Sequence, residues 1–461
     1  MLFNTIEFLV FLPVVTALFY LLPQRWRWLW LLAASCFFYM WFIPQYILIL
    51  AATIAIDYAA GLLMERWNDR PRWRRWCLVA SVVSTCAVLF VFKYLNFCSE
   101  NLVLMAQHFG WAHPQRALNI ALPIGLSFHT FQSLSYVIEV YRGNQRAERH
   151  AGYYALYVMF YPQLVTGPIE RPQNLLRQLH EKKELQADNI ARGMRLVLFG
   201  LFLKMVVADN IGTLVDQVYA APQDFGRADI VLAMVLYSFQ IYGDFFGYST
   251  IALGCARMMG FTLTDNFRTP YLADSIREFW HRWHISLSTW FRDYLYIPLG
   301  GNRVKLPRWM LNTMVVFTVC GIWHGANWTF MLWGAAYGVL LIVEKLAGSK
   351  NGRWRWMHVA LTFTAVTLLW TVFRAPSLGA LADIYGALIH GGGNGHLNIG
   401  APLIVALAAF IAIDVLTRRT RFDEWCGRMA APLRWTIYAL MAFAIVAFGS
   451  VEQHPFIYFQ F

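Results

Sequence analysis

The feature that most constrains this chain is a series of apolar runs, many of them close to 20 residues long, separated by shorter polar or basic stretches. Runs of this length match the hydrocarbon thickness of a lipid bilayer. The composition agrees, because 58% of the 461 residues are hydrophobic and only 14% are charged, whereas soluble domains carry about 25% charged residues. We therefore interpret the chain as an integral membrane protein.

Lipid offers the backbone no hydrogen bonds, so a crossing segment must satisfy its own N–H and C=O groups. This requirement predicts an all-α, polytopic helical bundle. We expect about ten to twelve transmembrane helices, with further interfacial or re-entrant pieces, in a single domain over 1–461. The candidate runs lie at 5–22, 29–46, 47–63, 77–94, 118–138, 152–166, 193–209, 229–256, 310–345, 357–374, 376–390, 401–416 and 433–450.

The net charge of +12 is explained by basic loops that face the cytosol and meet anionic lipid. Arginine clusters beside tryptophan, as in RPRWRRW at 70–76, suit such an interface. Nucleic-acid binding is not needed to account for the charge. We expect the arginine-rich stretch 65–76 on the cytosolic side. The seven cysteines form no CxxC pair, which predicts free thiols.

The stretch GIWHGANWTF at 321–330 carries one ionisable side chain, His324, within apolar surroundings. An ionisable group at membrane depth is costly and usually marks a functional path. A neutral imidazole can take the proton of a hydroxyl near pH 7, and burial keeps it neutral by lowering its pKa. We predict that His324 is a general base. Asn327 and Trp328 are candidates to orient the substrate or hold its carbonyl oxygen.

The same residues can also be explained by helix packing alone. The G-x-x-x-G patterns at 321–325 and 334–338 are typical of closely packed membrane helices, in which His324 would only bond across an interface. A second polar group is equally open to two interpretations. Tyr237, Gln240 and Asp244 share one face of a predicted helix, which is either a substrate wall or a packing interface. The carboxylate needs a partner or water at that depth.

The segment 262–308 interrupts the membrane spans and is too charged to cross a bilayer. Its apolar residues recur in steps of three and four, which predicts one amphipathic helix over 275–296 lying in the interface plane. A turn of about 100° per residue places His284 at the edge of the apolar stripe and His281 on the charged side. We therefore expect His284 to face the bundle. Two histidines are too few for a zinc site, so we expect neither a metal nor a bound cofactor.

The sequence FWHRWHISLSTWFRDYLYIPLGGNR, followed by WHGANWTF, resembles the signature of the membrane-bound O-acyltransferase family, in its bacterial polysaccharide O-acetylation branch. LPIGLSFHTFQSLSYVIEVYRG, YPQLVTGPIERP, DFFGYSTIALG and the C-terminal PFIYFQF are similar to that branch too. The resemblance runs essentially from end to end. One departure is His281, where the family more often has arginine or asparagine. A second is within DFFGYSTIALG, where Phe246 and Thr250 stand in place of the expected serine and aspartate.

The resemblance implies that His324 is the catalytic histidine, acting as a base or, as the less favoured alternative, as a transient acetyl carrier. It also implies that His284 is the conserved histidine before it. It implies an enzyme of the bacterial inner membrane that moves acetyl groups, expected to come from cytosolic acetyl-CoA, for O-acetylation of an exported polysaccharide such as alginate or cellulose. A lipase-like periplasmic acetyltransferase and a polysaccharide synthesis and export complex would be its partners. Two alternatives remain. A transporter without covalent chemistry would show repeated halves with broken helices, and a scaffold of the export complex would tolerate the loss of His324.

Overall fold

The computed structural model describes residues 1–111, 123, 125–165, 167–348, 354–450 and 456–457. Helices dominate these residues, and the one strand-like feature among them is an isolated bridge between Phe225 and Gly395. The predicted all-α class is confirmed. By length and composition, six of the described helices could cross a membrane, and three further apolar helices are shorter. The protein is thus a multi-pass helical membrane protein, and the total of ten to twelve spans stays a prediction.

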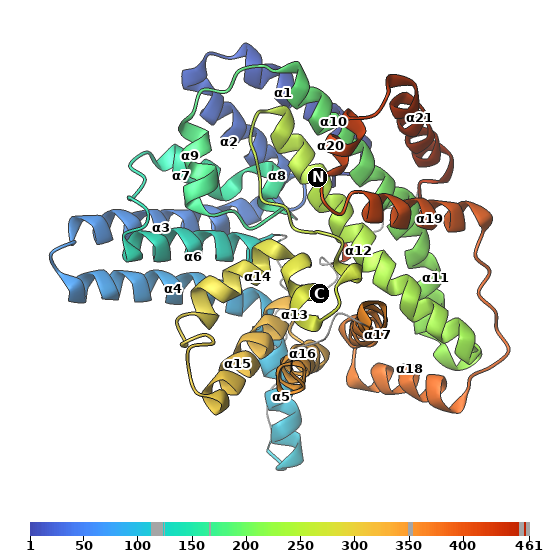
Figure 1. Ribbon diagram of the computed structural model, residues 1–461. Helices are drawn as coiled ribbons and strands as arrows, with labels where there is room; N and C mark the ends of the chain where they lie inside the picture. The colour runs from blue at the N-terminus through green and yellow to red at the C-terminus, as the bar shows by residue number, and fades with distance from the viewer. Residues whose placement is uncertain (112–122, 124, 166, 349–353, 451–455, 458–461) are drawn as a thin grey trace. The chain divides into compact units, whose positions relative to one another are not determined.

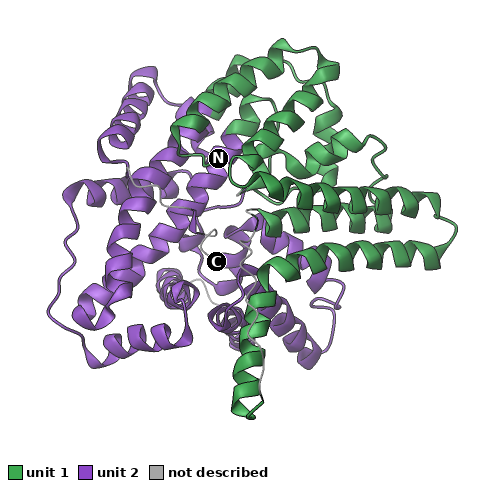
Figure 2. Ribbon diagram, turned by 180° about the vertical axis from the view of Figure 1, so that it is seen from behind, with its two compact units in different colours: residues 1–193, 255–264 green, residues 194–254, 265–461 purple. Residues whose placement is uncertain are grey.

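The chain divides into two compact units, which Figure 2 distinguishes by colour. Unit 1 comprises residues 1–193 and 255–264, and unit 2 comprises residues 194–254 and 265–461. This division rests on compactness, so the expected single domain over 1–461 stays a prediction.

Unit 1 is built around three helices, α3, α4 and α6, which pack against one another (Figure 1). Proline begins α4 at its first turn, where the missing N–H costs nothing. The helices of the unit are α1 (Ile6–Leu21), α2 (Gln24–Met40), α3 (Ile47–Arg66), α4 (Pro71–Lys93), α5 (Leu95–His108), α6 (Leu126–Arg142), α7 (Ala151–Met159), α8 (Tyr161–Leu164), α9 (Pro172–His180) and the start of α10 (Ala187–Leu201).

A buried carboxylate ties α3 to α4 inside unit 1. Asp57 of α3 is fully buried. It accepts hydrogen bonds from Ser81 Oγ at 2.5 Å and from Thr85 Oγ1 at 3.1 Å, both on α4. Polar groups between membrane helices stabilise by such bonds, because lipid offers no substitute partner. We infer that Asp57 locks the packing of these two helices.

Replacing Asp57 by leucine should therefore lower the stability of the protein. The change removes the acceptor for two buried hydroxyls, and we expect a loss of ~1–3 kcal/mol, seen as a lower melting temperature of the purified protein in detergent. Asp57→Asn keeps an acceptor oxygen and should lose less. Ser84→Ala on α4 is a matched control, because among the described residues Ser84 Oγ bonds only to the carbonyl of Ser81 on its own helix. Equal melting temperatures for Asp57→Leu and Ser84→Ala would contradict the inference that Asp57 stabilises the packing of α3 against α4.

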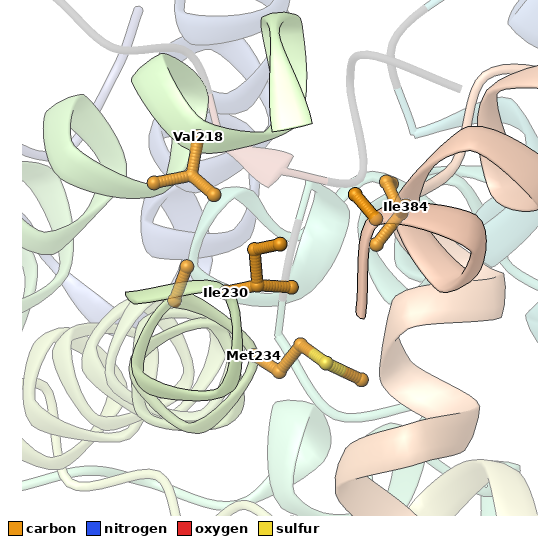
Figure 3. Close-up of a cluster of buried hydrophobic side chains, with 6 residues drawn as sticks. Val218, Ile230, Met234 and Ile384 are labelled. Carbon is orange, nitrogen blue, oxygen red and sulfur yellow. The ribbon is translucent and has the colours of Figure 1, made fainter. Parts of the chain in front are cut away.

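Unit 2 contains a hydrophobic cluster shared by three helices. Val218 of α11, Ile230 and Met234 of α12, and Ile384 of α18 meet there (Figure 3). The described helices of unit 2 are the remainder of α10, α11 (Asp209–Ala220), α12 (Arg227–Met258) up to residue 254, α13 (Ile276–Arg282), α14 (Ile285–Phe291), α15 (Leu306–His324), α16 (Trp328–Leu346), α17 (Arg355–Arg374), α18 (Leu378–His390), α19 (Ala401–Leu416), α20 (Phe422–Gly427) and α21 (Ala431–Phe448), with π-helical segments at Phe202–Ala208 and Arg292–Tyr296.

Candidate functional site

The apolar run 310–345 forms two helices, with His324 at the turn between them. α15 ends at His324, and α16 begins at Trp328. Gly321 and Gly334 let the helices touch, because a Cβ on Gly321 would lie 2.2 Å from the Phe330 carbonyl oxygen. The glycine patterns thus allow close packing of the two helices, as the packing interpretation predicted. His324 lies just beyond this contact.

Aromatic rings enclose the imidazole of His324, which is 5% exposed. The ring centroids of Trp323, Trp333 and Phe373 lie 5.0, 5.1 and 5.3 Å from that of His324. These rings come from α15, α16 and α17. The surroundings are apolar and leave the side chain almost inaccessible to solvent, and the role of His324 as a base stays a prediction.

The predicted single helix over 275–296 is wrong. The structure has α13, a break at Trp283 and His284, then α14 and a π-helical turn. The preceding loop causes the break, because Asn266 accepts the N–H of Ile285 at 2.9 Å. Hydrogen bonds from outside the segment thus replace the helical bonds that the local periodicity favoured.

The break turns His284 inward. Its backbone adopts the left-handed conformation, with φ of 43°, which costs a non-glycine residue about 1–2 kcal/mol. Its side chain is fully buried, and its ring lies 4.6 Å from that of Phe245. Burial lowers the pKa of His284 to about 3, so the imidazole is neutral. Strain of this kind persists where the surrounding structure enforces it, often at functional sites.

His281 lies in a different environment, as the sequence predicted. Its side chain is exposed at the end of α13. Its pKa is lowered by partial burial, and then by the positive charges of Arg277 and Arg292. The inward placement of His284 and the outward placement of His281 are therefore confirmed, although the continuous helix from which they were predicted is not.

The two candidate histidines meet at one indole. The ring of Trp323 lies 6.5 Å from that of His284 and 5.0 Å from that of His324. Residues separated by 40 positions in the sequence thus share an aromatic neighbour. Sequence reasoning missed Trp323, because a tryptophan inside an apolar run gives no signal beyond packing.

Asn327 and Trp328 have contacts other than those expected of them. The Asn327 side chain caps α16 by accepting the N–H of Thr329 at 3.0 Å, and it donates to the carbonyl of Pro376 at 2.6 Å. Trp328 is 51% exposed. The cap explains Asn327 structurally, since an asparagine at this position satisfies a free N–H of the first turn. A substrate-binding role for either residue stays a prediction.

Tyr237, Gln240 and Asp244 share a face of α12, as predicted, but that face looks toward α11 and the π-helical segment Phe202–Ala208. The Tyr237 ring lies 6.1 Å from that of Tyr219 on α11. A Cβ on Gly212 of α11 would meet Gln240 Nε2 at 2.8 Å. The contacts favour the packing interpretation of this stripe, and a role in substrate binding stays a prediction.

Asp244 has the partner that its depth required. Lys204 Nζ lies 2.8 Å from Asp244 Oδ1 and 2.6 Å from Asp209 Oδ1, and all three side chains are buried. Asp244 Oδ2 also accepts the N–H of Ile457 at 2.7 Å. Sequence reasoning missed Lys204, although a lone lysine within the run 193–209 was a usable signal for a buried ion pair.

That bond brings the C-terminal segment into unit 2. Phe456 is fully buried, and its ring lies 5.5 Å from that of Phe245, the residue that contacts His284. The rest of PFIYFQF lies outside the described residues.

Within the described part of the chain, no three His, Cys, Asp or Glu side chains are grouped to hold a metal ion. The site therefore offers two buried imidazoles surrounded by aromatic rings.

The sequence matches a known protein family and is similar to several known proteins. Residues 149–375 match MBOAT, the membrane-bound O-acyltransferase family. The chain is similar to the probable alginate O-acetylase AlgI of Pseudomonas putida, at 35% identity over 100% of both chains. The protein of the same name from Pseudomonas aeruginosa is 39% identical over 84% of this chain and 75% of its own. The peptidoglycan O-acetyltransferase of Helicobacter pylori is 32% identical over 84% of this chain and 80% of its own.

Proposed function

Because the chain belongs to the membrane-bound O-acyltransferase family, we propose that it moves acetyl groups across a bacterial inner membrane for the O-acetylation of an exported polysaccharide. The observation that carries this proposal is the burial of His284 and His324 against the same indole of Trp323. Relatives named alginate O-acetylase and peptidoglycan O-acetyltransferase support acetyl as the group and a polysaccharide as its destination.

His324 acts as the base in this proposal. Its imidazole takes the proton of the attacking hydroxyl, which makes the oxygen nucleophilic toward the acetyl carbonyl. Aromatic walls exclude water, so the activated acetyl group is protected from hydrolysis. His284, neutral and fixed by its strained backbone, orients the donor or lines the path to His324.

The acetyl donor in this proposal is acetyl-CoA from the cytosol. A lipase-like acetyltransferase in the periplasm completes transfer to the polymer, within a larger synthesis and export complex. Alginate and cellulose both fit as acceptors. This division of labour follows from chemistry, since a cytosolic thioester and an exported polymer lie on opposite sides of the bilayer.

The orientation makes a separate prediction. Asn68 lies in the exposed turn between α3 and α4, beside the arginines at 66, 70, 72, 74 and 75, and basic loops stay on the cytosolic side. In Asn68→Cys, a membrane-impermeant thiol reagent should label the position only after cells are opened. The background from the native cysteines is measured in parallel in the unmutated protein. Ready labelling in intact cells would reverse the orientation.

The function itself is tested with purified protein in lipid vesicles, given labelled acetyl-CoA and an alginate oligosaccharide, with and without the periplasmic partner. We expect release of free CoA and transfer of label that depends on the partner. Absence of CoA release from wild-type protein in the complete system would contradict the proposal. Transport of an unmodified solute without thioester consumption would favour a transporter, and label transfer that persists without this protein would favour a scaffold.

A further inference from the structure

Trp333 of α16 is a buried donor beside His324. Its side chain is fully buried, and within the described residues its indole Nε1 has no hydrogen-bond partner. Its ring lies edge-on to the imidazole, with centroids 5.1 Å apart and planes at 86°. An indole N–H can only donate, and a buried one usually finds an acceptor. Leaving it without one costs stability, so its presence here needs an explanation.

Two neighbouring aromatic residues, Tyr337 and Trp280, also carry buried hydrogen-bond donors. Tyr337 lies one helical turn further along α16, with its ring 5.1 Å from that of Trp333. Trp280 of α13 packs against both rings, at 5.8 Å from Trp333 and 5.0 Å from Tyr337. The Tyr337 hydroxyl and the Trp280 Nε1 are also buried without a hydrogen-bond partner in the described part of the chain. The cluster beside His324 thus presents donors, and the ligand that suits it presents an acceptor oxygen.

We propose that Trp333 donates its indole hydrogen to the carbonyl oxygen of the acetyl group during transfer. This inference rests on the proposed function, and it assigns a second catalytic group to the same site. A base and a carbonyl donor must each come within about 3 Å of atoms in one small reacting group. The rings of His324 and Trp333 are adjacent, with centroids 5.1 Å apart, so one small group beside them can be reached from both side chains. Asn327, by contrast, already donates to Pro376.

The proposed step transfers the acetyl group from the sulfur of CoA to the oxygen of an acceptor hydroxyl. The hydroxyl oxygen of the acceptor bonds to the carbonyl carbon while His324 removes the hydroxyl proton. The electron pair of the carbonyl double bond moves onto its oxygen, where the indole N–H of Trp333 stabilises the negative charge. As the double bond re-forms, the carbon–sulfur bond breaks and the CoA thiolate leaves. The imidazolium of His324 returns its proton to that thiolate, so the products are an ester and a thiol.

The competing explanation is that the N–H points at a ring face and serves packing alone. Two substitutions at the same position separate the possibilities. Trp333→Phe keeps an aromatic ring but has no donor, whereas Trp333→Tyr adds a hydroxyl donor to a ring of nearly the same size. Trp435→Phe is the control, because Trp435 lies on α21 and is 66% exposed.

The experiment measures CoA release from acetyl-CoA in the complete vesicle system, with the alginate oligosaccharide and the partner present. We expect Trp333→Phe to lower kcat about 100-fold with little change in KM, as for loss of one oxyanion donor. Trp333→Tyr should keep at least about tenfold more activity than Trp333→Phe, and Trp435→Phe should match wild type. Melting temperatures are recorded for each protein.

Each other outcome overturns the proposal. Equal kcat for the Phe and Tyr variants, or wild-type kcat in Trp333→Phe, makes the indole a packing element. Failure of both variants to accumulate in the membrane leads to the same conclusion. If wild-type protein itself releases no CoA, the proposed function fails and this inference fails with it, which distinguishes that result from a defect confined to Trp333→Phe.

Discussion

Replacing His324 by alanine should abolish acetylation of the exported polymer while the protein stays inserted and abundant. His324 is the base in the proposed reaction, and loss of a general base lowers the rate by ~10²- to 10⁴-fold. The effect on folding should be small, because the side chain lies at a turn and the close contact between α15 and α16 is made by Gly321 and Gly334. The measurement is the acetyl content of the polymer at matched protein abundance.

The control for this result is a change of similar size outside the site. His358→Ala on α17 removes a partly exposed imidazole that has no place in the proposed chemistry. It should leave the acetyl content unchanged. Wild-type acetylation in His324→Ala would remove the catalytic assignment and favour the packing interpretation of the GIWHG sequence.

The second large effect on polymer acetylation should distinguish His284 from His281, the two histidines of HRWH. His284→Ala should lower polymer acetylation by about 10²-fold or more, because the residue is fully buried and contacts both Phe245 and Trp323. His281→Arg should keep most of the activity, because His281 is exposed and lies near Arg277 and Arg292.

Both variants are compared at equal abundance in the membrane, because His284 also holds the strained turn between α13 and α14. A melting temperature close to that of wild type would show that lost acetylation in His284→Ala is a chemical effect. If His281→Arg were inactive and His284→Ala active, the roles of the two residues would have to be exchanged.

Several properties of this protein could be predicted from local sequence. The length of the apolar runs determined a helical membrane protein, because lipid leaves the backbone no other means of satisfying its hydrogen bonds. A single ionisable group in apolar surroundings, within a motif of a known family, was enough to identify His324 as a candidate, whose catalytic role stays a prediction. The polar face containing Asp244 also followed from helical periodicity alone.

Other features depended on contacts between residues far apart in the chain. The loop at Asn266 breaks the helix that periodicity predicted at 275–296, since its carbonyl takes the N–H of Ile285. Lys204 becomes the partner of Asp244 because folding places the carboxylate beside its ammonium group. The Asn327 side chain donates to the carbonyl of Pro376 on a distant part of the chain.

Contacts between residues far apart in the chain also bring the site residues together. His284 and His324 meet at Trp323, and Trp333 reaches His324 from the next helix. Sequence alone determined which residue types were available, because hydropathy, charge and periodicity are properties of neighbours along the chain. Only the tertiary structure decided which of them face one another, because burial, hydrogen bonding and ring contact are set by the packing of helices that the sequence does not place side by side.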